Sequence, residues 1–229
     1  MLRFYLIGGD MKSRIILILV ALLVLSGCAS KASFVYECPT EGLDKGKGRV
    51  VAAVARIVDE RKSPESFDNF YEGNPSDDLQ PILEHELFRT DVFKQVVSAN
   101  DIAPIKGDVL IEPTLNKLQW QVPDYDSLRA KAFLFGFFTG IIGGTIYGYT
   151  DTDVYGDSDL HLRVTEVSSG RVVLDKSYTG RYEQEIIKFK CDLPETRVMV
   201  AEKSLLKALE TIKSDIVKVL GKLNEGERL

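Results

Sequence analysis

Histidine, cysteine and tryptophan are scarce, with two, three and one residues respectively in 229. His85 stands between two glutamates and His161 stands in a predicted strand, so neither has a second histidine close by for binding zinc. The chain has no GxSxG motif, no P-loop and no dinucleotide-binding fingerprint. Its carboxylates are numerous, yet no spacing pairs two of them in a pocket. We therefore predict that the protein is not an enzyme and that it binds no cofactor and no metal.

An excess of basic charge is also missing. The formal net charge is −5, and removing residues 1–27, which carry three basic side chains and one acidic, leaves about −7. This balance argues against nucleic acid or anionic lipid as the main partner. Roughly 200 remaining residues are enough for one packed core, so we predict a single α/β domain over 49–221 and a polar tail over 222–229.

The N-terminal region has the layout of a secretory signal. Met11–Arg14 carries two basic side chains, Ile15–Leu25 is an uninterrupted apolar run, and Ser26 and Gly27 lead into Cys28. We predict a signal peptide over 1–27, with Met11 as the alternative true start. The stretch Leu25-Ser26-Gly27-Cys28 resembles the lipobox of bacterial lipoproteins, which implies a covalent lipid, including palmitate-type acyl chains, on Cys28. The alternative is an uncleaved anchor helix with an incidental cysteine.

The segment after the cysteine suggests where such a lipid would be anchored. Ala29 is not the aspartate that keeps enterobacterial lipoproteins in the inner membrane, so the resemblance implies the outer membrane, with the protein facing the periplasm. Residues 28–48 are polar with few apolar anchors and predict a lipidated tether. In an oxidising compartment Cys38 and Cys191 are candidates for a disulfide, although two separate thiols remain the alternative.

The hydrophobic pattern predicts five strands and two helices, and the fold class is α+β: a mixed, largely antiparallel sheet of about five strands backed by two helices. The first helix should be capped at Asp77 or Asp78 and run to Phe88, and the second should follow a capping box at Asp192 and stop at Gly221. The strands are expected over 49–58, 92–98, 108–121, 157–167 and 171–185.

Three segments of the sequence resemble a broad group of lipoproteins. They are Glu86 to Val97, Gly107 to Pro113 and Leu160 to Leu174. The group has the α/β domain of the curli-secretion lipoprotein and of the N-terminal part of the Tol-system β-propeller protein, and much of it is uncharacterised. The resemblance covers roughly 48–220 and implies a domain for assembly and partner contact, without catalytic residues.

An apolar, glycine-rich insertion interrupts the domain over 127–156. Ala132 to Thr150 carries no charge, and glycines recur in it at four-residue spacing, at Gly136, Gly140, Gly144 and Gly148. On a helix they form one stripe that allows a second backbone to approach closely, as in membrane helix pairs. This glycine zipper predicts membrane contact or self-association into an oligomer. The alternative is an apolar hairpin folded onto the protein's own sheet, with the glycines as turn residues.

Two further features of the sequence bear on function. The acidic run from Asp151 to Asp159 lacks the calcium ligands of an EF-hand, since Tyr155 and Leu162 take the fifth and twelfth positions, so we predict solvated turn acids. Trp120 is either a core residue or a surface anchor for a partner.

Taken together, the sequence predicts a non-enzymatic, outer-membrane-anchored lipoprotein of the cell envelope. It would self-associate or contact membrane as an accessory of envelope assembly or export, and would not bind nucleic acid. The alternative is a monomeric periplasmic module that binds and recruits another envelope protein, with its glycine-rich insertion folded as core.

Overall fold

The computed structural model describes residues 31–36, 46–99, 107–123, 131, 134, 150–191 and 193–224. These residues belong to one compact unit that starts at Lys31. Several predictions fall outside the described residues and stay predictions: the signal peptide and its start, lipidation of Cys28, and the roles of Cys38 and Asp192. The four zipper glycines, Gly136, Gly140, Gly144 and Gly148, and the last five residues of the predicted tail also lie outside them.

A mixed sheet forms one layer of the domain. Its strands are β1 (Val50–Val54), β2 (Val58–Asp59), β3 (Phe93–Ser98), β4 (Val109–Gln121), β5 (Asp151–Glu166) and β6 (Val172–Ile187). Their order is β3-β1-β4-β5-β6, with β2 also paired to β4. β1 runs parallel to β3 and β4, and β5 runs antiparallel to both of its neighbours, β4 and β6. The predicted α+β class is confirmed. A sixth strand arises because the strand predicted over 49–58 breaks at Arg56 and Ile57, where the Ile57 amide donates to the Gln80 side chain.

Strand β5 starts at Asp151, six residues before its predicted start. The prediction of solvated turn acids from Asp151 to Asp159 was therefore wrong, and the predicted insertion over 127–156 overlaps the beginning of β5. The physical reason is the period of two: Val154, Gly156 and Ser158 are buried on the inner face, while the alternating acids lie on the outer face. Pairing with β4 and β6 continues through this stretch.

The helices are α2 (Glu65–Asp68), α3 (Pro75–Phe88), α5 (Lys188–Cys191) and α6 (Pro194–Asn224). The predicted cap of α3 was wrong, because Asn74 caps it: its side chain accepts a hydrogen bond from the Ser76 amide, and Pro75 takes the first helical position. The predicted end of α6 was also wrong. Gly221 is helical, and the left-handed glycines among the described residues are Gly73 and Gly170.

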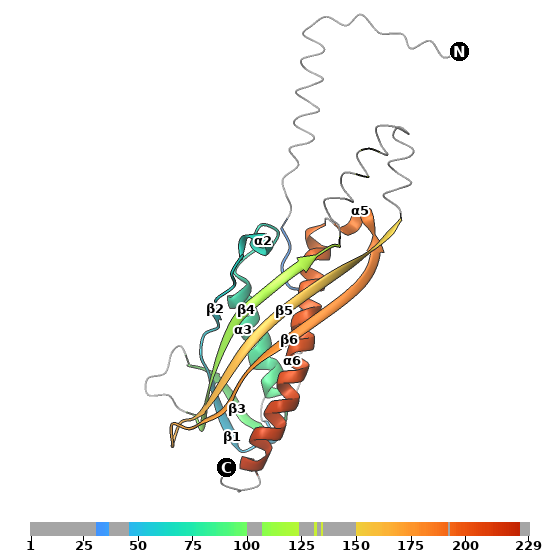
Figure 1. Cartoon of the computed structure of the whole chain (residues 1–229). Helices are drawn as coiled ribbons and strands as arrows, with labels where there is room; N and C mark the ends of the chain where they lie inside the picture. The colour runs from blue at the N-terminus through green and yellow to red at the C-terminus, as the bar shows by residue number, and fades with distance from the viewer. Residues whose placement is uncertain are drawn as a thin grey trace, which may run out of the picture. The chain divides into compact units, whose positions relative to one another are not determined.

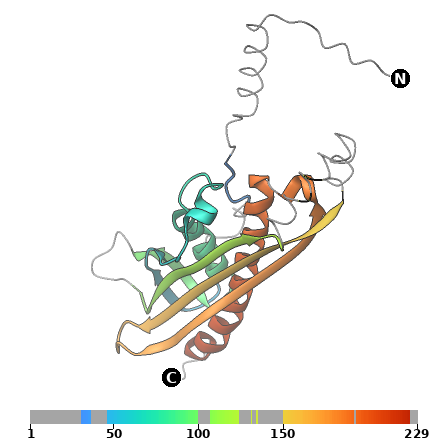
Figure 2. The same ribbon diagram turned by 45° about the horizontal axis from the view of Figure 1, so that its top comes forward.

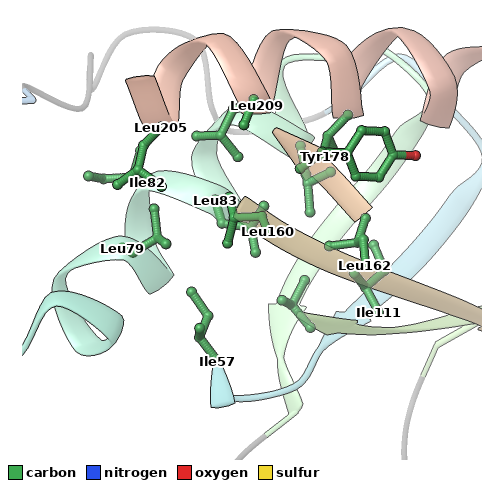
Figure 3. Packing of buried hydrophobic residues seen from close by; sticks show 14 of the residues in the cluster. Ile57, Leu79, Ile82, Leu83, Ile111, Leu160, Leu162, Tyr178, Leu205 and Leu209 are labelled. Atoms are coloured by element: carbon green, nitrogen blue, oxygen red, sulfur yellow. The ribbon is translucent and has the colours of Figure 1, made fainter. Parts of the chain in front are cut away.

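The hydrophobic core lies between the sheet and helices α3 and α6, which cover the same face of it (Figures 1 and 2). Figure 3 shows Leu79, Ile82 and Leu83 of α3 with Leu205 and Leu209 of α6, packed against residues of the sheet. The apolar residues that recur at helical spacing along α6 form its buried face and are at most 2 % exposed: Val198, Ala201, Leu205, Leu209, Ile212, Ile216 and Leu220. The outer face of β4, β5 and β6 carries mostly polar side chains.

Two strand glycines let α6 lie unusually close to the sheet. A Cβ atom on Gly156 would be 1.9 Å from the Val200 carbonyl oxygen, and one on Gly180 would be 1.9 Å from the Ser204 carbonyl oxygen. Real Cβ atoms do not approach an oxygen so closely. The backbone of α6 therefore rests directly on β5 and β6, which fixes the long helix in the position that the site below depends on.

Candidate functional site

Residues 31–36 form an extended segment, here called the N-terminal arm, that packs on the domain. Side chains of the arm alternate: Ala32, Phe34 and Tyr36 pack against the main core, whereas Val35 is 74 % exposed. The sequence predicted a polar tether over 28–48, and for these six residues the structure differs. The alternation of apolar with polar or exposed residues has the period of a strand, which lets a short segment bury every second side chain.

The start of the arm is held by α2 and the residues that follow it. The Ala32 amide donates to the Phe70 carbonyl oxygen at 3.0 Å, and the Glu72 amide donates to the Ala32 carbonyl oxygen at 2.9 Å. The Phe34 ring lies 4.8 Å from the Tyr71 ring, centroid to centroid. These contacts fix the arm at the point where the chain enters the domain.

The end of the arm is bound by a buried carboxylate. The Tyr36 hydroxyl donates to Glu86, which also accepts from Lys213 and, at 3.3 Å, from Arg89. The same hydroxyl lies 3.0 Å from Nδ1 of His85. Burial raises the pKa of Glu86, but the hydrogen bonds from Lys213 and Tyr36 outweigh it, so that its pKa is below the ordinary value. Glu86 therefore links the arm, α3 and α6 through one ionised group.

A second carboxylate holds the middle of the arm. The Val35 amide donates to Oε2 of Glu202 at 3.1 Å, and Glu202 is 6 % exposed on α6. The arm thus contacts α2, α3 and α6 within six residues. Neither Tyr36, Glu86 nor Glu202 was singled out from the sequence. The alternating Ala32-Ser33-Phe34-Val35-Tyr36 pattern could have indicated the arm, but only the tertiary structure brings Glu86 and Glu202 beside it.

A cationic stack joins the entry of the arm to the end of β4. The Arg197 guanidinium lies 3.6 Å from the centroid of the Phe70 ring and 4.1 Å from that of Trp120. Such cation–π contacts contribute up to about 2 kcal/mol when they are removed from water. Trp120 is partly buried against a second small core, which consists of Val122, Val154, Cys191 and Val200. This packing supports the interpretation of Trp120 as a core residue rather than a surface anchor.

Of the two cysteines predicted as a disulfide pair, the structure describes one. Cys191 is 5 % exposed in that second core, just before α6 begins. Cys38 lies outside the described residues, so the bridge stays a prediction. The arm ends with Tyr36 at Glu86, and Lys213, which also donates to Glu86, lies 22 residues along the chain from Cys191.

The outer face of the sheet is polar and mostly paired. Lys117 lies 3.5 Å from Asp157, His161 lies 2.8 Å from Asp175, and the Arg181 guanidinium lies 4.6 Å from the Tyr155 ring centroid. Within the described ranges, no three His, Cys, Asp or Glu side chains gather closely enough to hold a metal ion. None of the helices in those ranges combines the length and apolar character that a membrane span requires.

Comparisons with known proteins give structural likenesses only. No family model matches the chain, and no curated protein matches it. Its structure is similar to that of a Xanthomonas campestris protein of the family of unknown function DUF330, with 8 % identity, 86 % of this chain and 98 % of that chain covered, and a TM-score of 0.45.

It is also similar to a PelC dodecamer subunit from Paraburkholderia phytofirmans, with 13 % identity, 69 % of this chain and 87 % of that chain covered, and a TM-score of 0.34. A third likeness is to a minor lipoprotein of Acinetobacter baumannii, with 9 % identity, 72 % of this chain and 93 % of that chain covered, and a TM-score of 0.35. All three are distant. The lipobox and the resemblance to the curli and Tol group stay predictions.

Proposed function

We propose that this chain is a non-enzymatic lipoprotein of the bacterial envelope, anchored by lipid on Cys28 and held against the membrane by its arm. One observation carries the proposal: the arm is already packed on the domain at Ala32, four residues after Cys28. Extended chain spans at most about 3.6 Å per residue. A lipid on Cys28 would therefore lie within about 14 Å of a fixed point on the domain.

This short link has a consequence for what the protein can do. A long flexible tether would let the domain sample a wide volume, and binding would then depend on the partner's own position. A docked arm instead fixes the domain at the bilayer surface. Such a protein suits contact with other envelope components at the membrane rather than capture of distant ones.

The finer role rests on sequence features outside the described residues. Ala29 after the cysteine supports the outer membrane, with the domain facing the periplasm, and the glycine stripe supports self-association or membrane contact. We propose an accessory role in envelope assembly or export on that basis.

The anchoring is tested by metabolic labelling with radioactive palmitate, followed by separation of inner and outer membranes by density. We expect the wild-type protein to carry label and to sediment with the outer membrane. Cys28→Ala should carry none and should no longer sediment with the outer membrane, whereas Cys191→Ala, a matched loss of one thiol, should keep the label. A labelled Cys28→Ala protein, or an unlabelled wild type, would disprove lipidation at this residue.

Self-association is tested by light scattering of the lipidated protein in mild detergent. Gly140→Leu with Gly144→Leu should convert an oligomer into a monomer, because two leucines on the stripe prevent close helix approach. Gly143→Leu, which places the same side chain off the stripe, should leave the oligomer intact. Monomeric wild-type protein would refute the zipper.

Monomeric behaviour would instead favour the recruiting module. One observation supports that second candidate: the outer face of the sheet is open among the described residues and its acids outnumber its bases. On β5, Asp153, Asp157 and Asp159 face outward and Arg163 is the arginine of that strand, while Lys117 of β4 and Arg181 of β6 lie opposite two of these acids. This face would suit a basic protein surface.

A further inference from the structure

One end of the domain brings together segments that are far apart in the sequence. We call it the α5 end and define it by Lys31, Pro123, Thr150, Lys190 and Leu193. In Figures 1 and 2, α2, α5 and the first turn of α6 lie together at one end of the sheet, opposite the turn between β5 and β6.

Contacts between described residues join these segments. Ala32 is bonded to Phe70, whose ring lies on Arg197, and Arg197 also stacks on Trp120 near the end of β4. On the other side of the same end, the Lys188 amide and side chain both donate to Thr150, directly before β5. The arm, the residues that end β4 and the residue that precedes β5 therefore lie at one end of the domain.

We infer that the α5 end is the surface by which the domain touches the lipid bilayer. The inference rests on the proposed lipidation. Lipid on Cys28 has to lie within reach of Lys31, and the two described flanks of the apolar run, Pro123 and Thr150, lie at this same end. Two parts of the chain with predicted affinity for lipid are therefore attached to one end of the domain, and a bilayer is the occupant that accommodates both.

The exposed side chains of this end suit an interface with lipid. Leu193 is 45 % exposed although it lies between two helices, and its amide donates to the Lys190 carbonyl oxygen at 3.1 Å. Lys190 is exposed beside it. A lysine next to an exposed leucine can place its stem along the acyl boundary and its ammonium group among headgroups.

The net charge of the α5 end does not attract it to an anionic bilayer. Asp151 and Asp153, at the start of β5, are exposed near the same end and oppose the lysines. Contact should therefore depend on the lipid anchor and on apolar side chains, and it should change little with salt.

The test uses the full-length lipidated protein in vesicles of phosphatidylethanolamine and phosphatidylglycerol. A fluorescent amino acid is placed at position 193 or at position 217. Leu193 and Val217 are matched, being 45 % and 44 % exposed, and Val217 lies on α6. A helix rises about 1.5 Å per residue, which separates the two positions by about 36 Å. A fraction of the phosphatidylethanolamine carries a nitroxide quencher on its headgroup.

We expect the reporter at 193 to lose most of its emission when quencher lipid is present, and the reporter at 217 to keep it. Equal emission loss at both positions, loss only at 217, or no loss at 193 in vesicle-bound protein would each overturn the inference. The palmitate content of the same samples is measured in parallel. Unlabelled protein that does not bind vesicles would refute the proposed anchoring, which is a separate outcome from bound protein in another orientation.

Discussion

Adding a single methyl group at Gly180 should loosen the whole contact between α6 and the sheet. In Gly180→Ala the new Cβ would lie 1.9 Å from the Ser204 carbonyl oxygen and 2.9 Å from the Ala208 amide nitrogen. Both are backbone atoms of a helix and cannot rotate away. A carbon-to-oxygen contact relaxes to about 3.3 Å, so α6 has to move outward by about 1.4 Å at this point.

The cost follows from what that movement separates. Leu205 and Leu209, the buried α6 residues next to this contact, are at most 2 % exposed. A gap of 0.5–1 Å removes about a quarter to a half of a dispersion contact, and burial of each leucine is worth about 1.5–3 kcal/mol. Including the neighbouring side chains, we expect a loss of about 3 kcal/mol in the free energy of unfolding, at the upper end for an overpacked core.

Urea unfolding of the full-length protein in mild detergent measures this loss. Far-UV circular dichroism reports the helices, and fluorescence of the single tryptophan reports the interface, because Trp120 stacks against Arg197 of α6. Gly221→Ala is the control: a Cβ there meets nothing within 4 Å, and alanine in a helix should add up to about 1 kcal/mol. If Gly180→Ala unfolds within about 0.5 kcal/mol of wild type, the close approach described here is wrong.

Two further predictions concern the arm. Tyr36→Phe removes a hydrogen bond to buried Glu86 and should lower the free energy of unfolding in urea by about 1–2 kcal/mol, with faster proteolysis in the arm. Val35→Ala, which changes an exposed side chain, should match wild type. Equal behaviour of the two variants would show that the arm is not held at Tyr36. Because the pKa of Glu86 is lower in the folded than in the unfolded state, its contribution is complete above its unfolded pKa and is lost as the pH falls through its folded pKa. Glu86→Gln should therefore be less stable than wild type at pH 7 and should lose less further stability on acidification. The urea midpoints of both proteins are measured from pH 7 down through the folded pKa of Glu86. Midpoints that fall in parallel with pH would contradict this prediction.

Regular periodicity made much of the fold predictable. The buried face of α6 follows from the spacing of Val198 to Leu220, and the three long antiparallel strands follow from alternation. The errors came where local signals compete. Asp77 and Asp78 are good caps, yet Asn74 before Pro75 is used, and Gly221 is a common helix terminator that here stays helical.

The run from Asp151 to Asp159 shows a second kind of error. Its acids, one glycine and serine have low strand propensity, and they predict a turn when taken alone. In the folded protein, pairing on both sides and the approach of α6 at Gly156 outweigh that propensity. The same glycine that weakens an isolated strand is required where a helix backbone touches it.

The sequence by itself determined the α+β class, the two principal helices and the antiparallel strands, because each depends on neighbours within a few turns. Lipid attachment at Cys28 stays a prediction from a contiguous motif. Only the tertiary structure decided that Glu86 and Glu202 hold the arm, that Arg197 bridges Phe70 and Trp120, and that the arm and both flanks of the apolar insertion meet at the α5 end. The contacts of Glu86, Glu202 and Arg197 named here join residues between 50 and 167 positions apart. No local pattern in a chain specifies which distant side chains the packing of a sheet against two helices will bring together.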